Sequence, residues 1–414
     1  MLIHWIWFAT LPQLKIGQKL ALLQRFSDPE EIFHTAEAAC TQAEDLTQEG
    51  RKALCDGDLS LAQKILKECS EKSISILTFG DAAYPRRLKN IADPPLVLYY
   101  KGVLPDFESV PVVAVVGTRK ATAYGLTTAR NMSAQIAACG ALVISGAAHG
   151  IDAMAMEGAM DAGSKVVGVL GCGVDIVYPK SNSRLFKQVL ENGCLMSEYP
   201  PGTQPFAWNF PRRNRILSGI ASGVLVVEAP EVSGALITAR QALEQGRDVF
   251  AVPGNIDVTT CTGSNALLQE GASAVFTGWD VVREYEPQYP DAVAKRDVQW
   301  SEKAVAPLQA EQTVVKVAQE RSVLEKHSRA SHASDKKDID NPAQSNYSGI
   351  DTRVAALSQD EKQILACLDS QPRPVDAVIA QVNMPASKVL GSLTMLAVKG
   401  IVVNHPGKRV SRKF

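Results

Sequence analysis

Residues 112–119 read Val-Val-Ala-Val-Val-Gly-Thr-Arg, an apolar run that ends in glycine, threonine and arginine. A run of this length without polar residues is typical of a strand that is buried on both faces of a sheet. The glycine lets the backbone approach a ligand closely, and the arginine places a cation beside it. The stretch therefore predicts a central strand with an anion site at its carboxyl end.

Comparable runs recur along the middle of the chain and alternate with helical patterns. The predicted strands are residues 112–116, 141–145, 166–170, 195–197, 224–227 and 249–252. After the first of them, Leu126, Ala129, Met132 and Ile136 recur at helical spacing. Buried strands that alternate with helices predict an α/β fold, a central extended Rossmann-like, doubly wound parallel sheet that is covered on both faces.

The flanking regions predict further domains. Residues 1–73 carry apolar positions at helical spacing and predict a small helical domain of the helix-hairpin-helix or SAM type. Because Gln13 stands where such a hairpin has glycine, a plain helical packing module stays an open alternative. Prolines rule out a long helix in residues 74–111, which we assign as a strand-bearing extension of an extended Rossmann-like domain that spans residues 74–286.

The C-terminal part changes composition twice. Residues 287–352 are rich in Gln, Ser, Ala, Lys and Asp and predict a flexible linker. Residues 353–414 predict three helices and a hairpin, the pattern of a winged-helix domain. Its third helix offers only Lys388 and Lys399, while the wing and tail are more basic. Contact with duplex DNA and docking to a protein therefore remain equally open for this domain.

Composition limits the classes of function. The chain has 414 residues, is 46% hydrophobic and carries a formal net charge of -1, which excludes a uniformly basic DNA-coating protein. Its 8 cysteines lack Cys-x-x-Cys or Cys/His spacing, so we expect neither disulfides nor a metal site. The apolar start lacks a basic segment and a cleavage site, so we expect a cytoplasmic protein with no membrane segment.

Binding of a common nucleotide cofactor is not expected. The first predicted turn reads Gly-Thr-Arg-Lys instead of Gly-x-Gly-x-x-Gly, and no Gly-x-x-x-x-Gly-Lys-Ser/Thr motif occurs. Asp152, Asp175, Glu198 and Glu228 lie near predicted strand ends, where a catalytic or metal-binding role is conceivable. We favour helix-start acids or partners for arginine instead, and assign no catalytic residue and no cofactor.

A basic and aromatic segment, Phe-Pro-Arg-Arg-Asn-Arg-Ile-Leu-Ser at residues 210–218, is the second element of the predicted site. Arginines pair with phosphates, asparagine can bond a base edge, and a phenylalanine ring can stack on an unpaired base. The alternative is that the arginines form internal ion pairs and Phe210 belongs to the core. Gly-rich turns at three predicted strand ends favour the anion site.

The candidate residues for binding single-stranded DNA and its phosphates lie at these turns and in this segment. They are Gly117, Thr118, Arg119, Ser145, Gly146, Gly150, Gly171, Gly173, Phe210, Arg212, Arg213, Asn214 and Arg215.

Ordered motifs from residue 81 to residue 282 resemble the DNA-processing protein A family, DprA or Smf. The motifs are Tyr84-Pro85, Asp93-Pro94-Pro95, Gly117-Thr118-Arg119, Gly150-Ile151-Asp152, Gly171-Cys172-Gly173, Tyr178-Pro179, Ser197-Glu198-Tyr199-Pro200, Phe210-Pro211-Arg212-Arg213-Asn214-Arg215, Ser233-Gly234 and Val252-Pro253-Gly254. Departures from the family pattern are Ala207, where relatives have a basic residue, and His149, Met156 and Ala235, whose counterparts commonly differ.

The resemblance implies a non-enzymatic protein of natural transformation and DNA recombination. It would bind and protect incoming single strands, help to load the RecA recombinase, and act as a homodimer. By motif match, Arg119 and residues 210–215 would hold the strand. We expected apolar surface around Leu267, Val281 and Val282 to support dimerisation.

Two other functions stay open. The first is a phosphoribohydrolase-like enzyme that processes nucleotides on the same type of sheet, although the catalytic glutamate of such enzymes has no counterpart here. The second is a transcription regulator that acts through the winged helix.

Overall fold

The computed structural model describes residues 1–42, 45–296 and, towards the C-terminus, 359–369, 373–382, 401–405 and 409–412 with a few single positions between them. The chain divides into two compact units, Met1–Ala310 and Glu311–Phe414, which are described separately. Most of the predicted linker, residues 297–352, lies outside the described residues.

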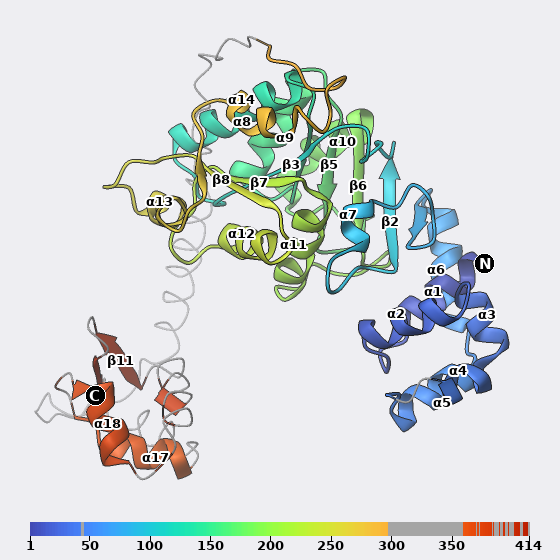
Figure 1. Ribbon diagram of the computed structural model, residues 1–414, viewed down its shortest axis with the longest axis horizontal. Helices are drawn as coiled ribbons and strands as arrows, with labels where there is room; N and C mark the ends of the chain where they lie inside the picture. The colour runs from blue at the N-terminus through green and yellow to red at the C-terminus, as the bar shows by residue number, and fades with distance from the viewer. Residues whose placement is uncertain are drawn as a thin grey trace, which may run out of the picture. The chain divides into compact units, whose positions relative to one another are not determined.

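A nine-stranded sheet forms the centre of the first unit (Figure 1). Its strands are β1 (Ser75–Thr78), β2 (Val97–Gly102), β3 (Val112–Val116), β4 (Leu142–Ser145), β5 (Val166–Val169), β6 (Gly193–Ser197), β7 (Gly223–Val226), β8 (Asp248–Ala251) and β9 (Ser273–Ala274). Their order across the sheet is β1-β2-β6-β5-β4-β3-β7-β8-β9. The six predicted strands are confirmed. The neighbouring strands β6-β5-β4-β3-β7-β8-β9 all run parallel to one another.

The extension before β3, which the sequence predicted to carry strands, contains the two antiparallel strands β1 and β2. β1 pairs with β2, and β2 pairs with β6, so this hairpin continues the main sheet at one edge. The alternation of side chains along β3 shows why the sheet is apolar throughout. Val113 and Val115 face one core cluster, while Val112, Ala114 and Val116 face the other. Both faces of the sheet are therefore buried under helices, as predicted.

Helices cover the sheet in two layers, which Figure 1 shows above and below it. One layer contains α8 (Ala123–Ala138), α9 (Ile151–Asp161), α10 (Ser183–Asn192) and α14 (Gly278–Val282). The other contains α7 (Arg86–Lys89), α11 (Asn209–Ile220), α12 (Gly234–Glu244) and α13 (Thr262–Gln269).

The strand order places a crevice at the carboxyl end of β3. After β3 the chain builds β4, β5 and β6 on one side, and it later returns to add β7 and β8 on the other side. At such a switch point the loops that follow neighbouring strands diverge to opposite faces of the sheet, which opens a crevice. The fold therefore positions a ligand site between the segments that follow β3, β4 and β7.

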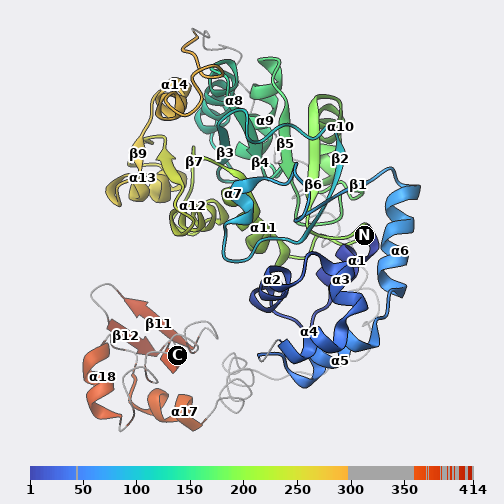
Figure 2. The ribbon, with the colours of Figure 1, turned by 45° about the vertical axis from the view of Figure 1, so that its right-hand side comes forward.

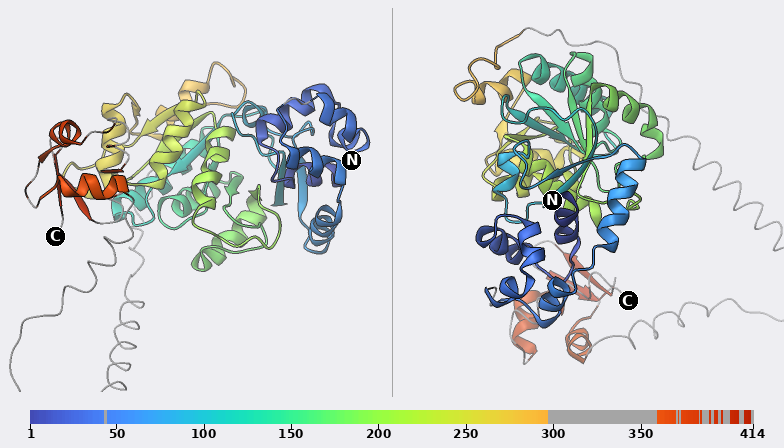
Figure 3. Two further views of the ribbon diagram at one scale, coloured as in Figure 1. Left: turned by 90° about the horizontal axis from the view of Figure 1, so that it is seen from below. Right: turned by 90° about the vertical axis from the view of Figure 1, so that its right-hand side faces the viewer.

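Six helices precede the sheet and lie beyond its β1–β2 edge (Figures 2 and 3). They are α1 (Leu2–Thr10), α2 (Ile16–Arg25), α3 (Pro29–His34), α4 (Ala36–Gln42), α5 (Gln48–Asp56) and α6 (Ser60–Glu71). Ile6, Trp7 and Phe8 of α1 are buried in a core that is continuous with one face of the sheet. The sequence indicated this helical region correctly, whereas its kinship with helix-hairpin-helix or SAM domains stays a prediction.

Two sequence expectations are wrong in this unit. Tyr289 and Val293 are buried in the same core, so the ordered chain extends beyond residue 287, where we expected the linker to begin. Leu267, Val281 and Val282 are at most 4% exposed, because they fill the space between the sheet and its helices. They consequently offer no surface to a second copy of the chain.

The second unit has its own small core. Its described elements are α17 (Gln359–Ala366), β10 (Arg373–Pro374), α18 (Val375–Gln381), β11 (Val402–His405) and β12 (Arg409–Arg412), with the strand order β10-β12-β11. β11 and β12 form the predicted hairpin. Most of the third predicted helix, with Lys388 and Lys399, lies outside the described residues. Within the described part of the chain, no helix has the length and apolar character needed to cross a membrane.

A close approach between α8 and α9 provides a test of the packing. Gly158 in α9 lies so near α8 that an added Cβ would overlap the carbonyl oxygen of Arg130. We predict that Gly158→Ala lowers the free energy of unfolding by about 1–3 kcal/mol, because the helices must move apart. Gly17→Ala in α2 is the control, since no heavy atom lies within 4 Å of its added Cβ. Equal urea midpoints for the two variants would contradict this packing.

Candidate functional site

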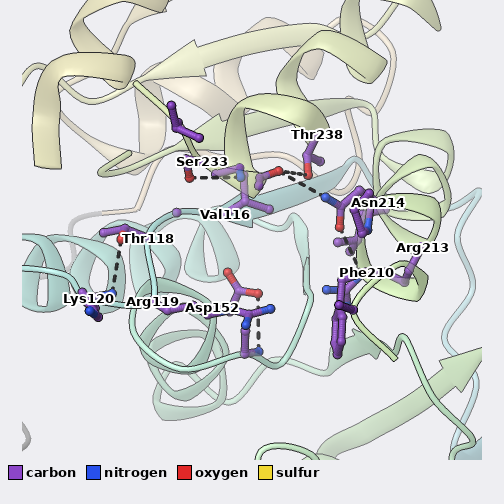
Figure 4. Close-up of a pocket in the computed structure, with 18 of the residues that line it drawn as sticks. Val116, Thr118, Arg119, Lys120, Asp152, Phe210, Arg213, Asn214, Ser233 and Thr238 are labelled. Atoms are coloured by element: carbon purple, nitrogen blue, oxygen red, sulfur yellow. Dashed lines mark hydrogen bonds between the residues drawn. The ribbon is translucent and has the colours of Figure 1, made fainter. Parts of the chain in front are cut away.

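A pocket of about 550 Å³ opens at the switch point (Figure 4). Most of its lining comes from the end of β3, the first turns of α11 and the loop from β7 into α12, and the segment after β4 adds Ala148 and Asp152. The structure brings six of the predicted site residues into its lining. These are Gly117, Thr118, Arg119, Phe210, Arg213 and Asn214.

Arg119 and Phe210 form the accessible part of the pocket. The guanidinium carbon of Arg119 lies 5.3 Å from the centre of the Phe210 ring, which is within cation–π range. The ring is half-buried and also lies 5.5 Å from the Tyr178 ring. Arg119 and its neighbour Lys120 are exposed. The mouth of the pocket therefore combines two free cations with an aromatic face.

Arg213 does not have the role that the sequence suggested. It is 4% exposed, and its Nη1 donates to the carbonyl oxygens of Gly146, at 2.9 Å, and of Val169. Burial lowers the pKa of Arg213 to about 10, and the nearby Asp152 carboxylate partly opposes this shift. A guanidinium that is buried and hydrogen-bonded in this way has few N–H donors left for a phosphate. We therefore reassign Arg213 to the wall that holds α11 against the sheet.

Arg215 is also committed within the protein. It is 7% exposed and donates to Glu198 at 2.8 Å and to Asp93 at 3.0 Å. Burial opposes its charge, but these two carboxylates raise the pKa of Arg215 above its ordinary value. Arg212 differs, because its side chain is 61% exposed and its Nε lies 3.7 Å from Glu198. Arg215 is thus held by two carboxylates of the protein, whereas Arg212 stays accessible outside the pocket.

Asn214 contributes to the junction between α11 and α12. Its Nδ2 donates to the carbonyl oxygen of Gly234 at 3.1 Å, and its Oδ1 accepts from Nε of Arg213 at 3.2 Å. Since both ends of the amide are used, Asn214 orients the wall of the pocket in this state.

Ser145, the last residue of β4, and Gly146, which follows it, are internal. The Ser145 hydroxyl donates to the carbonyl oxygen of Val115 at 2.6 Å, and Gly146 supplies an acceptor for Arg213. Both are buried and neither lines the pocket. They shape the site from behind instead of contacting a ligand.

The remaining predicted glycines support close packing at the same edge. Gly150 has φ 78° and lies against the carbonyl oxygen of Thr118, where a side chain would collide. Gly171 lies behind the Phe210 ring, and a Cβ there would meet that ring at 3.0 Å. Gly173 is buried in the loop after β5, outside the pocket lining. These positions accommodate protein atoms, so their predicted role in ligand approach is indirect.

Each carboxylate considered in the sequence has a partner inside the protein. Asp175 accepts from Lys72 at 2.7 Å, Glu198 from Arg215, and Glu228 from the Thr122 hydroxyl at 2.8 Å. Asp152 lies in the pocket wall, where burial raises the pKa of its carboxyl although Arg213 opposes the shift. Among the lining residues, Asp152 is the only acid.

The sequence missed the third wall of the pocket. Ser233 caps α12 by accepting from the amide of Ala235 at 3.2 Å, and Gly234 begins the helix at an exposed position beside the pocket. The unsatisfied amides at a helix start favour an anion. A Ser-Gly pair in the loop that follows the predicted strand at residues 224–227 was the available signal, and its composition matches the predicted Ser145-Gly146 turn.

An exposed aromatic pair lies beside the pocket. The rings of Phe206 and Trp208 are stacked, with centroids 4.8 Å apart and an interplanar angle of 6°. They are 46% and 71% exposed, although Pro205 and Ala207 next to them line the pocket. A large apolar surface of this kind is suited to contact a flat apolar partner.

A second depression, of about 490 Å³, lies between the N-terminal helices and the sheet. Lys19 of α2 lines it and is 6% exposed, and its ammonium donates to the carbonyl oxygen of Ala9 at 2.8 Å. Burial, together with repulsion from Arg212, lowers the pKa of Lys19 from 10.5 to about 8. Within the described chain, no carboxylate oxygen lies within 4.0 Å of this ammonium.

The sequence of this chain is similar to the sequences of a known protein family. Residues 75–286 match the family described as DNA recombination-mediator protein A, and residues 351–408 match the DprA winged helix domain. Protein Smf of Synechocystis sp. is 33% identical over 353 residues, which cover 84% of this chain and 83% of that protein.

Two further proteins, both described as DNA processing proteins, are similar to this chain. DNA processing protein DprA of Bacillus subtilis is 38% identical over 239 residues, which cover 58% of this chain and 78% of that protein. The X-ray structure of DNA processing protein A from Streptococcus pneumoniae is similar, with a TM-score of 0.60 and 33% identity over 69% of this chain and 98% of that chain.

The internal role of Arg213 predicts an effect on stability. Arg213→Met removes the donor for two buried carbonyl oxygens and leaves Asp152 without its neighbouring cation. We expect the free energy of unfolding to fall by about 3–5 kcal/mol. Arg119→Met is the matched control, and its exposed position predicts a change within about 0.5 kcal/mol. Similar urea midpoints for the two variants would refute the reassignment.

The buried ammonium of Lys19 predicts a dependence on pH. Between pH 8 and 10.5 the unfolded chain keeps a proton that the folded chain has lost, so stability should rise with pH in this window. Lys19→Met removes the buried charge. We expect it to raise the free energy of unfolding at pH 7 by about 1–3 kcal/mol and to flatten the rise above pH 8. Urea titrations at pH 7 and 9 measure both effects, and a less stable variant at pH 7 would argue against them.

Proposed function

The chain belongs to the DprA/Smf family of DNA recombination-mediator proteins, and on that premise we propose that it binds single-stranded DNA through the pocket at the end of β3. We further propose that it protects incoming strands during natural transformation and passes them to a RecA-type recombinase. The family description as a recombination mediator supports the second step.

The pairing of Arg119 with Phe210 carries this proposal. An unpaired strand offers phosphates and uncovered base faces at the same time, whereas a duplex hides its base faces in the stack. The exposed guanidinium and the ring lie 5.3 Å apart, so one nucleotide could present its phosphate to Arg119 or Lys120 and its base to Phe210. The start of α12 adds partial positive charge on the opposite wall.

The stacked pair of Phe206 and Trp208 extends the site beyond the pocket. Stacking on aromatic rings tolerates any base, because every base has a π face. A strand leaving the pocket would meet this exposed ring surface within the same segment that carries Phe210. The arrangement fits binding without sequence preference, which a protein that receives arbitrary incoming DNA requires.

Homodimerisation belongs to the proposal on family grounds. Two copies would present two pockets to one strand, which raises the effective affinity without any new contact.

A binding role without catalysis agrees with the chemistry of the pocket. Hydrolysis of a nucleotide generally needs an acid and a base, but Asp152 is the only carboxylate in the lining. Incubation of the protein with nucleoside monophosphates separates this view from the phosphoribohydrolase alternative. Steady release of free base would overturn the binding role.

The proposed site predicts two different losses of affinity. Arg119→Ala should weaken binding of a single-stranded oligonucleotide and reduce the salt dependence by about one phosphate contact. Phe210→Ala should weaken binding by about 1–3 kcal/mol with an unchanged salt slope, because stacking is lost. Fluorescence anisotropy at two salt concentrations measures both.

Arg130→Ala is the control for these variants, since Arg130 is a partly exposed arginine in α8 that pairs with Asp161 away from the pocket. Binding by Arg119→Ala and Phe210→Ala that equals this control would show that the site is misplaced. Tighter binding of duplex than of single-stranded oligonucleotide would instead favour the transcription regulator.

A further inference from the structure

Three potential metal ligands lie close together where α1 meets α3, in the N-terminal helical region and outside the lining of the pocket. His4 in α1 and Glu30 and His34 in α3 each direct one donor atom to the same place, and these atoms lie within 4.8 Å of one another. His4 Nδ1 is 3.6 Å from Glu30 Oε1. Imidazole nitrogen and carboxylate oxygen are donors that zinc accepts in proteins.

The state of His4 is a second, independent indication of a ligand. The residue is 8% exposed, yet its Nδ1 has no hydrogen-bond partner in the described structure. The separation from Glu30 is too long for a hydrogen bond. A buried polar atom without a partner is unfavourable and unusual in a folded protein. An ion between the two groups would satisfy this nitrogen.

The spacing of the donors suits a small cation. Zinc–ligand distances of about 2.0–2.2 Å place neighbouring donors of a tetrahedral site roughly 3.3–3.5 Å apart. His4 and Glu30 are already close to this spacing, and His34 is exposed, so its ring can rotate inward. The second oxygen of Glu30 accepts from the Met1 ammonium at 3.0 Å, which leaves Oε1 for the ion.

The surroundings resemble those of a structural site with one open side. The Phe33 ring lies 4.9 Å from the His4 ring and 5.2 Å from the Trp7 ring, so aromatic groups shield one side of the donors. Exposed His34 borders the other side, where water can complete the coordination. Two imidazoles and one carboxylate favour Zn²⁺ and similar transition metals over Mg²⁺ and Ca²⁺, which prefer oxygen donors.

We propose that His4, Glu30 and His34 bind a divalent transition-metal ion, best matched by Zn²⁺, which ties α1 to α3 in the N-terminal helical region. No Cys/His motif marks this site in the sequence, and one of its donors is a glutamate. The folded arrangement of the two helices brings them together. Binding of the ion stabilises the helical region and leaves the pocket after β3 unchanged.

Calorimetric titration of Zn²⁺ into the untagged, metal-free full chain tests the proposal. We expect saturation of one site by Zn²⁺ and none by Mg²⁺ at the same concentration. Saturation should raise the melting temperature by at least about 2 °C, because only the folded chain presents the three donors together. His34→Ala and Glu30→Gln should each weaken Zn²⁺ binding by at least about tenfold.

His149→Ala is the matched control. This partly exposed histidine lies in the loop between β4 and α9, and its Nε2 is 2.9 Å from Oγ of Ser181. Zinc binding that survives in this variant but is lost in His34→Ala supports the site. Zinc binding that is unchanged in His34→Ala and Glu30→Gln, or saturation only at millimolar Zn²⁺, overturns it. Single-stranded DNA binding by His34→Ala should match the parent, so the two proposals can fail independently.

Discussion

A single buried guanidinium holds the functional edge of this protein together. Arg213 reaches from α11 to the carbonyl oxygens of Gly146 and Val169, which follow β4 and end β5. The arginine donates to these two carbonyl oxygens at the ends of the strands and so fixes the first turns of α11 against the sheet. Phe210 is one turn earlier on the same face of that helix. The position of the aromatic surface therefore depends on a cation that is itself only 4% exposed.

The sequence predicted the sheet well because buried parallel strands have a simple signature. Strands β3 to β8 are apolar on both faces, so no other arrangement suits them. The extension that carries β1 and β2 was predicted to contain strands, but its pairing with β6 was not predicted, because that pairing joins segments that are far apart in sequence. The beginning of the linker was misplaced because Tyr289 and Val293 are isolated apolar residues in a polar stretch. The average composition of a segment does not reveal single buried residues of this kind.

The candidate site was predicted by residue type but not by residue role. A run of three arginines reads as a basic patch, yet helical geometry divides it: Phe210, Arg213 and Leu217 share one face of α11, while Arg212 and Arg215 turn elsewhere. Applying the helical period to this segment would have placed Arg213, but not Arg212 or Arg215, on the pocket face of the helix. The contacts of Arg215 with Asp93 and Glu198 had no such signal, because they depend on tertiary proximity.

The two edges of the sheet have a consequence for assembly. β9, with only two residues, closes one edge, and β1 closes the other beside the N-terminal helices. Neither edge offers a long row of free amide and carbonyl groups, which is the template that strand-to-strand association needs. Within the described residues, the nine-stranded sheet is therefore poorly suited to grow by edge-to-edge strand pairing, so its contacts with other molecules fall to side-chain surfaces.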